Sequence, residues 1–225
     1  MLARGDILTF IESESAAAAA TISAATLDAR VPSCPDWSLA ELIGHLGRVQ
    51  RFWAHAARAG GTERQPPPEE NVPDDANELD SWFRASSADL LGALHDVAWD
   101  TPAWTWWKED RTVGAIARHQ VQEAAVHRWD AQLALGAPQP LPPEIAGDGV
   151  DEFLGIARQL RGPVPIAFYA SDSGATFSAG PGEAVVTVSA PASDLVLLLY
   201  GRVSADDVRV EGDRAALAPF LTPIG

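Results

Sequence analysis

Hydrophobic positions between residues 5 and 135 recur at three- and four-residue spacing, the period of helices with one buried face. The first helical segment continues into an alanine-rich stretch that favours helix by propensity. The second begins after Ser38, which forms a capping box with Glu41, and ends before a glycine pair. The predicted helices cover residues 5–28, 39–59, 78–97 and 112–135. Four helices with short connections favour a four-helix bundle, which we assign to residues 1–137.

A proline-rich linker at residues 136–144 separates this region from a different pattern. Beyond it, short apolar runs bounded by glycine, serine and aspartate predict strands, with helical segments between them. The predicted elements are a helix at 145–161, two strands within 165–180, a strand at 183–190, a helix at 193–202, a strand at 208–212 and a helix at 213–221. The predicted fold class is therefore α + (α+β), a helical bundle followed by a small α+β domain over residues 144–225.

The helix at 112–135 carries acidic and imidazole side chains in one stripe. At about 100° per residue, His127 lies about 40° to one side of Glu123, and Asp130 about 20° to the other. Long polar side chains that belong in water are expected on the opposite face: Arg118, Arg128 and Gln132. The stripe therefore faces the interior, where an ionised carboxylate requires a partner.

A candidate partner comes from the second helix, where His45 lies on the same face as the predicted core leucines. Two imidazoles and a carboxylate, with Glu123 and His127 four residues apart, suit one divalent metal. These ligands favour Zn²⁺ and leave a coordination position open, although Ni²⁺ or Fe²⁺ could also fit. Asp130 would orient a ligating histidine from behind. The alternatives are a surface ion pair on the fourth helix and a core histidine at position 45.

Three further features of the sequence allow more than one structural interpretation. His119, one turn before Glu123, could be a further metal ligand, a group that supports a ligand or a surface residue, and we expect it on the surface. The tryptophans around residues 99–107 are expected in the core, with some of them lining a pocket. The acidic, proline-rich loop at residues 64–75 is expected to be exposed, either closing over a site or serving only as a connection.

The charge balance excludes some classes of partner. With 31 acidic and 16 basic residues, the net charge is −15, which argues against nucleic acid or an anionic membrane. Cys34 is the single cysteine, so no intramolecular disulfide can form, and we expect a small buried side chain there rather than a nucleophile. Neither a signal peptide nor a membrane span is evident, which predicts a cytoplasmic protein.

Three stretches resemble the mycothiol-dependent maleylpyruvate isomerase family. These are VPSCPDWSLAELIGHLGRVQRFWA with its Cys-Pro-x-Trp opening, VQEAAVHRWDAQLALG, and the aliphatic helix with Gly-Arg in APASDLVLLLYGRV. The resemblance implies a DinB-like metal-binding bundle followed by a domain similar to sterol carrier proteins. It implies zinc held by His45, Glu123 and His127, and a substrate-binding role for Arg202 near the site. Many relatives have histidine where this chain has Gln122, a position outside the inward sector.

The function implied by the resemblance is zinc-dependent activation of a low-molecular-weight thiol, mycothiol or another, for addition to a small electrophile. The chain would act as an isomerase or an S-transferase, with the thiol and the electrophile as its partners. The alternative is a non-catalytic module that binds a metal or a small molecule on the same fold. A lipid carrier ranks last, because about eighty residues leave little room for an acyl chain.

Overall fold

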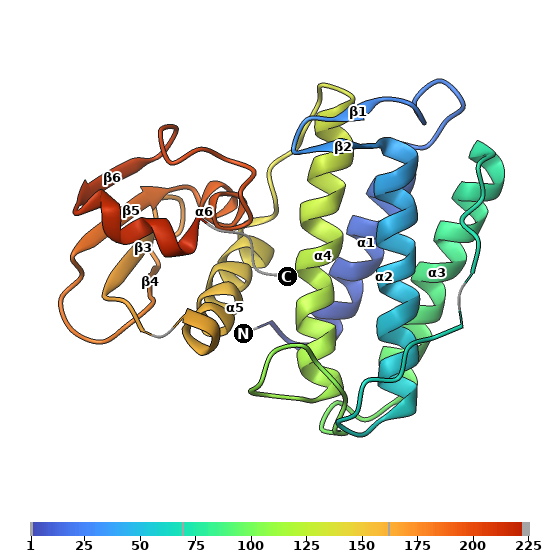
Figure 1. Cartoon of the computed structure of the whole chain (residues 1–225), viewed down its shortest axis with the longest axis horizontal. Helices are drawn as coiled ribbons and strands as arrows, with labels where there is room; N and C mark the ends of the chain where they lie inside the picture. Colours follow the sequence, from blue (N-terminus) through green and yellow to red (C-terminus); the bar gives the residue numbers. More distant parts are fainter. Residues whose placement is uncertain (1, 69, 162, 222–225) are drawn as a thin grey trace. The chain divides into compact units, whose positions relative to one another are not determined.

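The computed structural model describes residues 2–68, 70–161 and 163–221 (Figure 1). The chain divides into two compact units, Leu2–Gln139 and Pro140–Gly225. The first is helical and the second combines helices with a sheet, so the predicted fold class is confirmed. Within the described part of the chain, no helix is long and apolar enough to cross a membrane.

The first unit is built from α1 (Arg4–Ala19), α2 (Leu39–Ala59), α3 (Ala76–Asp96) and α4 (Val113–Ala134). In Figure 1, α1 and α4 run in one direction and α2 and α3 in the other. Helix α2 packs between α3 and α4, and α1 packs against α3 and α4 on the other side. Because α2 and α3 are parallel, the connection at residues 60–75 must return along the length of the bundle.

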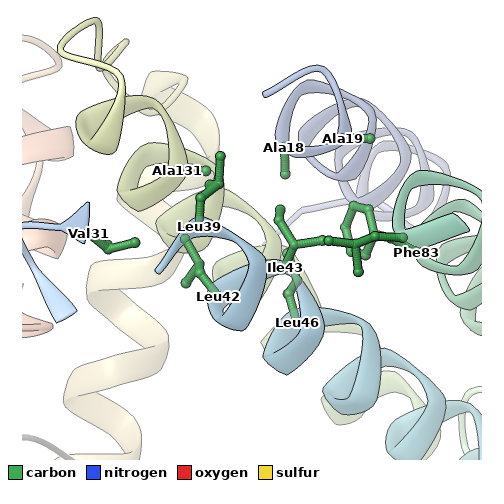
Figure 2. Packing of buried hydrophobic residues seen from close by; sticks show 10 residues of the cluster. Ala18, Ala19, Val31, Leu39, Leu42, Ile43, Leu46, Phe83 and Ala131 are labelled. Carbon is green, nitrogen blue, oxygen red and sulfur yellow. The ribbon is translucent and has the colours of Figure 1, made fainter. Parts of the chain in front are cut away.

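Two features stabilise the start of α2: a capped first turn and a cluster of buried hydrophobic side chains. Ser38 accepts a hydrogen bond from the amide of Glu41, whose carboxylate accepts one from the amide of Ser38, so the first turn is capped as predicted. Leu42, Ile43 and Leu46 are fully buried next to Phe83 of α3. Figure 2 shows these side chains together with alanines of α1 and α4. Burial of each such side chain stabilises the fold by about 1.5–3 kcal/mol.

The segment after α1 differs from the prediction. The helix ends at Ala19, where a helix to residue 28 was predicted, and residues 30–38 form a hairpin that was not predicted. Thr26 donates a hydrogen bond to the carbonyl of Thr21 and accepts one from the amide of Ser23. Such local side-chain bonds offer the backbone an alternative to the helix, and they outweigh alanine propensity here. The hairpin strands are β1 (Arg30–Val31) and β2 (Cys34–Ser38).

The second unit begins with α5 (Pro143–Arg161) and contains a four-stranded sheet in the order β4-β3-β5-β6. The central strands β3 (Ile166–Ala170) and β5 (Val186–Ala190) are parallel, and the edge strands pair antiparallel with them. Alternate residues of both central strands are buried, as their apolar–polar alternation requires. The remaining elements are β4 (Thr176–Ser178), α6 (Ala192–Leu199), β6 (Arg209–Gly212) and a 3₁₀ helix, η1 (Arg214–Phe220).

Candidate metal centre

His45 of α2 and Glu123 and His127 of α4 lie together inside the bundle. One ligand atom from each side chain can be chosen so that all three lie within 4.8 Å of one another. The imidazoles of His45 and His127 meet edge to face, with ring centroids 5.2 Å apart. Glu123 Oε2 lies 3.5 Å from His127 Nε2, close to the separation of about 3.4 Å between ligands of a tetrahedral zinc ion. The three side chains thus have the chemistry and the spacing to hold one metal ion.

A chain of hydrogen bonds orients His127. Asp130 is fully buried, and its Oδ2 lies 2.9 Å from Nδ1 of His127. Its other oxygen accepts a hydrogen bond of 2.5 Å from the hydroxyl of Ser33, in the turn between β1 and β2. With Nδ1 held in this way, the remaining nitrogen, Nε2, points toward Glu123. This is the arrangement in which a carboxylate fixes the tautomer of a ligating histidine.

The β1–β2 hairpin also contacts the second imidazole. Trp37 of β2 lies with its ring centroid 4.7 Å from that of His45, at an interplanar angle of 42°. The hairpin therefore supplies Trp37, which contacts His45, and Ser33, which bonds to the carboxylate that orients His127. Neither was singled out as a site residue from the sequence. For Ser33 the reason is distance along the chain, because nothing in the local pattern connects it with Asp130, 97 residues away.

His119 is buried, so the expectation that it lies on the surface is wrong. Its Nε2 lies 3.4 Å from Oε1 of Glu123, the oxygen opposite the one that faces His127. The Trp-rich connection before α4 covers it, with ring contacts from Trp106 and Trp107, and Trp53 of α2 adds a third. Trp107 and Trp53 are themselves buried, as expected for core tryptophans. Glu123 therefore has a histidine at each of its two oxygens.

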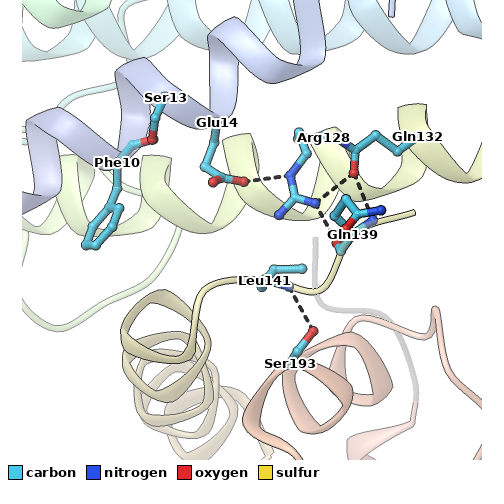
Figure 3. A network of polar contacts seen from close by, with 8 residues as sticks. All are labelled: Phe10, Ser13, Glu14, Arg128, Gln132, Gln139, Leu141 and Ser193. Atoms are coloured by element: carbon cyan, nitrogen blue, oxygen red, sulfur yellow. Dashed lines mark hydrogen bonds and ion pairs between the residues drawn. The ribbon is translucent and has the colours of Figure 1, made fainter. Parts of the chain in front are cut away.

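Arg128 is also buried, so its predicted projection into water is wrong. Its Nε donates to Glu14 of α1 at 2.7 Å, and its Nη1 donates to the side chain of Gln132 and to the carbonyl of Gln139 (Figure 3). The helical period shows correctly that Arg128 lies away from Glu123, but that face of α4 is covered by α1. Glu14 supplies the opposite charge that makes burial of the guanidinium tolerable.

The neighbouring charges shift two pKa values. Burial lowers the pKa of His127, but hydrogen bonds and charge from Asp130 and Glu123 outweigh this and raise it from 6.5 to about 9. Burial raises the pKa of Glu123, but His119 and His127 hold it well below its usual range. Without a metal, Glu123 is therefore ionised and His127 carries a proton at neutral pH. A metal ion at this position would replace that proton.

The remaining residues that the sequence analysis considered are Arg202, Gln122 and Cys34. Arg202 follows α6 in the second unit, and its Nη1 donates to the carbonyl of Tyr200 at 2.8 Å. Gln122 is fully buried. Cys34 is half-buried in β2, against the core around the start of α2. The substrate-binding role of Arg202 stays a prediction.

Two solved structures share the fold. One is described as the mycothiol-dependent maleylpyruvate isomerase and the other as a point mutant of it, with TM-scores of 0.69 and 0.70. Both are 18% identical to this chain, and each match covers 93% of both chains. No curated protein matches the sequence significantly.

Two family models match the chain in order. The mycothiol maleylpyruvate isomerase N-terminal domain matches residues 9–132, a range that includes His45, Glu123 and His127. The C-terminal domain of the same family matches residues 143–219, which include Arg202. Since the two models together span most of the chain, it belongs to the mycothiol-dependent maleylpyruvate isomerase family.

Proposed function

We propose that this protein is a zinc-dependent enzyme that activates a low-molecular-weight thiol, with mycothiol as the first candidate, for addition to a small electrophile. The observation that carries the proposal is the cluster of His45, Glu123 and His127, three protein ligands drawn from two antiparallel helices. Three ligands of this kind leave a position open for a fourth, which is the pattern of catalytic rather than structural zinc. Ni²⁺ or Fe²⁺ would be accepted by the same donors.

Zinc, when bound, would keep the sulfur of the thiol as a thiolate at neutral pH, and the thiolate is the reactive form. The side chains around it have separate roles. Glu123 contributes a negative charge toward the dication, and His119 holds the carboxylate oxygen that faces away from His127. Asp130 accepts from Nδ1 of His127 and so keeps Nε2 available as a ligand.

The reaction class follows from the chemistry of a thiolate. Addition to a conjugated double bond forms a carbon–sulfur bond and moves the π electrons onto the neighbouring carbonyl, so the former double bond can rotate. Elimination then restores the double bond and releases the thiolate, which gives an isomer without net oxidation. Protonation of the adduct at carbon instead gives an S-transferase product. For Arg202 we propose that its planar guanidinium binds a carboxylate of the electrophile.

Thiol-dependent consumption of a conjugated electrophile tests this proposal. We expect turnover that requires both a thiol and the metal, and that is lost in Glu123→Gln. The Glu78→Gln variant, altered at an acidic residue in the first turn of α3, serves as a control that keeps activity. If the parental chain binds zinc but accelerates no thiol addition, the alternative of a non-catalytic binding module is supported instead.

A further inference from the structure

A cavity of about 540 Å³ lies in the helical unit, against the outer side of α2. This volume falls in the range of about 300–1,000 Å³ that small-molecule sites occupy. Its lining comes from α2, α3 and the proline-rich loop, and it includes none of the three candidate metal ligands. Arg48 and Val49 in the lining nevertheless lie one helical turn beyond His45. The lining comprises Arg48, Val49, Arg51, Phe52, Trp53, Arg64, Pro66, Pro67, Pro68, Glu70, Asn71 and Trp82.

Two glycines of α2 allow close approach of Trp82, which lines the cavity, and of Val72 in the adjoining loop. A Cβ on Gly47 would lie 2.2 Å from the ring of Trp82, and one on Gly44 would lie 2.9 Å from Val72 in the loop. Both glycines therefore provide space that any other residue would fill. The wall on the α3 side is thus the ring of Trp82, which lies directly against the backbone of α2 at Gly47.

The loop wall is also anchored. Arg51 forms an ion pair of 2.6 Å with Glu70 and donates to the hydroxyl of Ser86, while its guanidinium lies over the ring of Trp82. Three consecutive prolines in the lining, Pro66 to Pro68, restrict the backbone of the loop at these positions. A cavity with preorganised walls loses little ordering entropy when a ligand binds.

The charge inside the lining is opposite to that of the whole protein. Three arginines and one glutamate line the cavity of a chain whose net charge is −15. Arg51 is engaged with Glu70, whereas Arg48 and Arg64 have no carboxylate partner among the described residues. Arg64 lies over the rings of Phe52 and Trp104, which leaves its guanidinium edge available as a donor. The indole nitrogen of Trp82 is buried and has no acceptor within the described part of the chain.

We propose that this pocket binds a small organic carboxylate with a flat apolar body. The carboxylate would accept hydrogen bonds from Arg48 and Arg64, and the body would lie against Phe52, Trp53 and the prolines. Apolar walls with a few converging charged donors are the usual composition of such a site. The pocket gives the proline-rich loop a role as one wall of a binding site. The proposal goes beyond the thiol chemistry and does not require it.

The test is titration of the full chain with benzoate, monitored by tryptophan fluorescence and by calorimetry. Uncharged benzamide serves as the comparison ligand. We expect saturable binding of benzoate and much weaker binding of benzamide. Arg48→Gln and Arg64→Gln should each weaken benzoate binding about fivefold, as expected for exposed charge pairs. Arg58→Gln should leave it unchanged, because Arg58 lies on α2 but pairs with Asp89 and is not in the lining.

The His127→Ala variant separates this pocket from the metal site. Benzoate binding should survive in that variant, whereas loss of binding together with the metal would place the ligand on the metal and overturn the proposal. Failure of benzoate to saturate the parental chain would overturn it as well. So would unchanged affinity in the Arg48→Gln and Arg64→Gln variants, provided that circular dichroism shows that they are folded.

Discussion

Asp130 and His127 form a buried pair, with Oδ2 of the carboxylate 2.9 Å from Nδ1 of the imidazole and the other carboxylate oxygen bonded to Ser33. This pair determines which nitrogen of His127 is presented to Glu123. It also links the candidate metal centre to the β1–β2 hairpin, an element that the sequence did not predict. The roles that we assign to the cluster depend on this orientation.

The Asp130→Asn substitution should weaken zinc binding while the chain stays folded. An amide can donate to Nδ1 as well as accept from it, so the tautomer with Nε2 available is no longer favoured. We expect a loss of about 10–100-fold in zinc affinity, measured by competition with a chelating dye. Ser33→Ala should have a smaller effect in the same direction. An unchanged zinc affinity in Asp130→Asn would contradict the orienting role.

The Glu14–Arg128 pair should contribute strongly to stability. Glu14→Gln removes the carboxylate that pairs with the buried guanidinium of Arg128, and we expect the free energy of unfolding to fall by about 3 kcal/mol. Asp80→Asn is the matched control, because it breaks the more exposed Arg84–Asp80 pair and should cost less than about 1 kcal/mol. Urea denaturation of both variants measures the difference. Equal losses would show that burial of the Arg128 pair has no energetic consequence.

Metal binding should release a proton from His127 at neutral pH. The pKa of this imidazole, raised from 6.5 to about 9, means that it is protonated in the metal-free protein at pH 7. Zinc affinity should therefore increase as the pH rises toward about 9, by about tenfold per pH unit at most. Calorimetry at pH 7 in buffers of different ionisation enthalpy measures the proton released, and we expect about one. Release of none would refute the protonated state.

The same pKa predicts how the stability of the metal-free protein depends on pH. A pKa that is higher in the folded state than in the unfolded state stabilises the fold when the group is protonated. This contribution is complete below pH 6.5 and is lost as the pH rises through about 9. Urea denaturation of metal-free protein between pH 6.5 and 9 should show the loss, and His127→Ala should not show this component. A parental profile identical to that of the variant would count against the pair with Asp130.

Arg202→Gln should raise KM for electrophiles that carry a carboxylate and leave KM for uncharged electrophiles unchanged. Arg202→Lys should recover only part of the loss, because an ammonium group cannot form the planar two-point contact of a guanidinium. Arg209→Gln is a suitable control, since Arg209 is an exposed residue of the same unit that pairs with Glu211. A uniform loss for charged and uncharged electrophiles would indicate a structural role for Arg202.

The convergence of His45, Glu123 and His127 could be anticipated because each helix has a regular period, and two antiparallel helices in a bundle face each other. The same period could not show what covers the remaining faces of α4. Glu14 reaches Arg128 from α1, and tryptophans from a connection cover His119. The first contact joins distant parts of the chain and the second comes from an irregular connection, so neither follows from a helical period and the polar character of these side chains was misleading. Ser33 was missed for the same reason.

The most direct measurement is the metal content of protein purified without a histidine tag or added metal, determined by elemental analysis. We predict about one zinc ion per parental chain, none in His127→Ala, and one in His95→Ala, whose histidine is exposed at the end of α3. Parental protein that contains no metal and takes up none on titration would contradict the proposed metal centre. Stoichiometric metal in His127→Ala would contradict the assignment of its ligands.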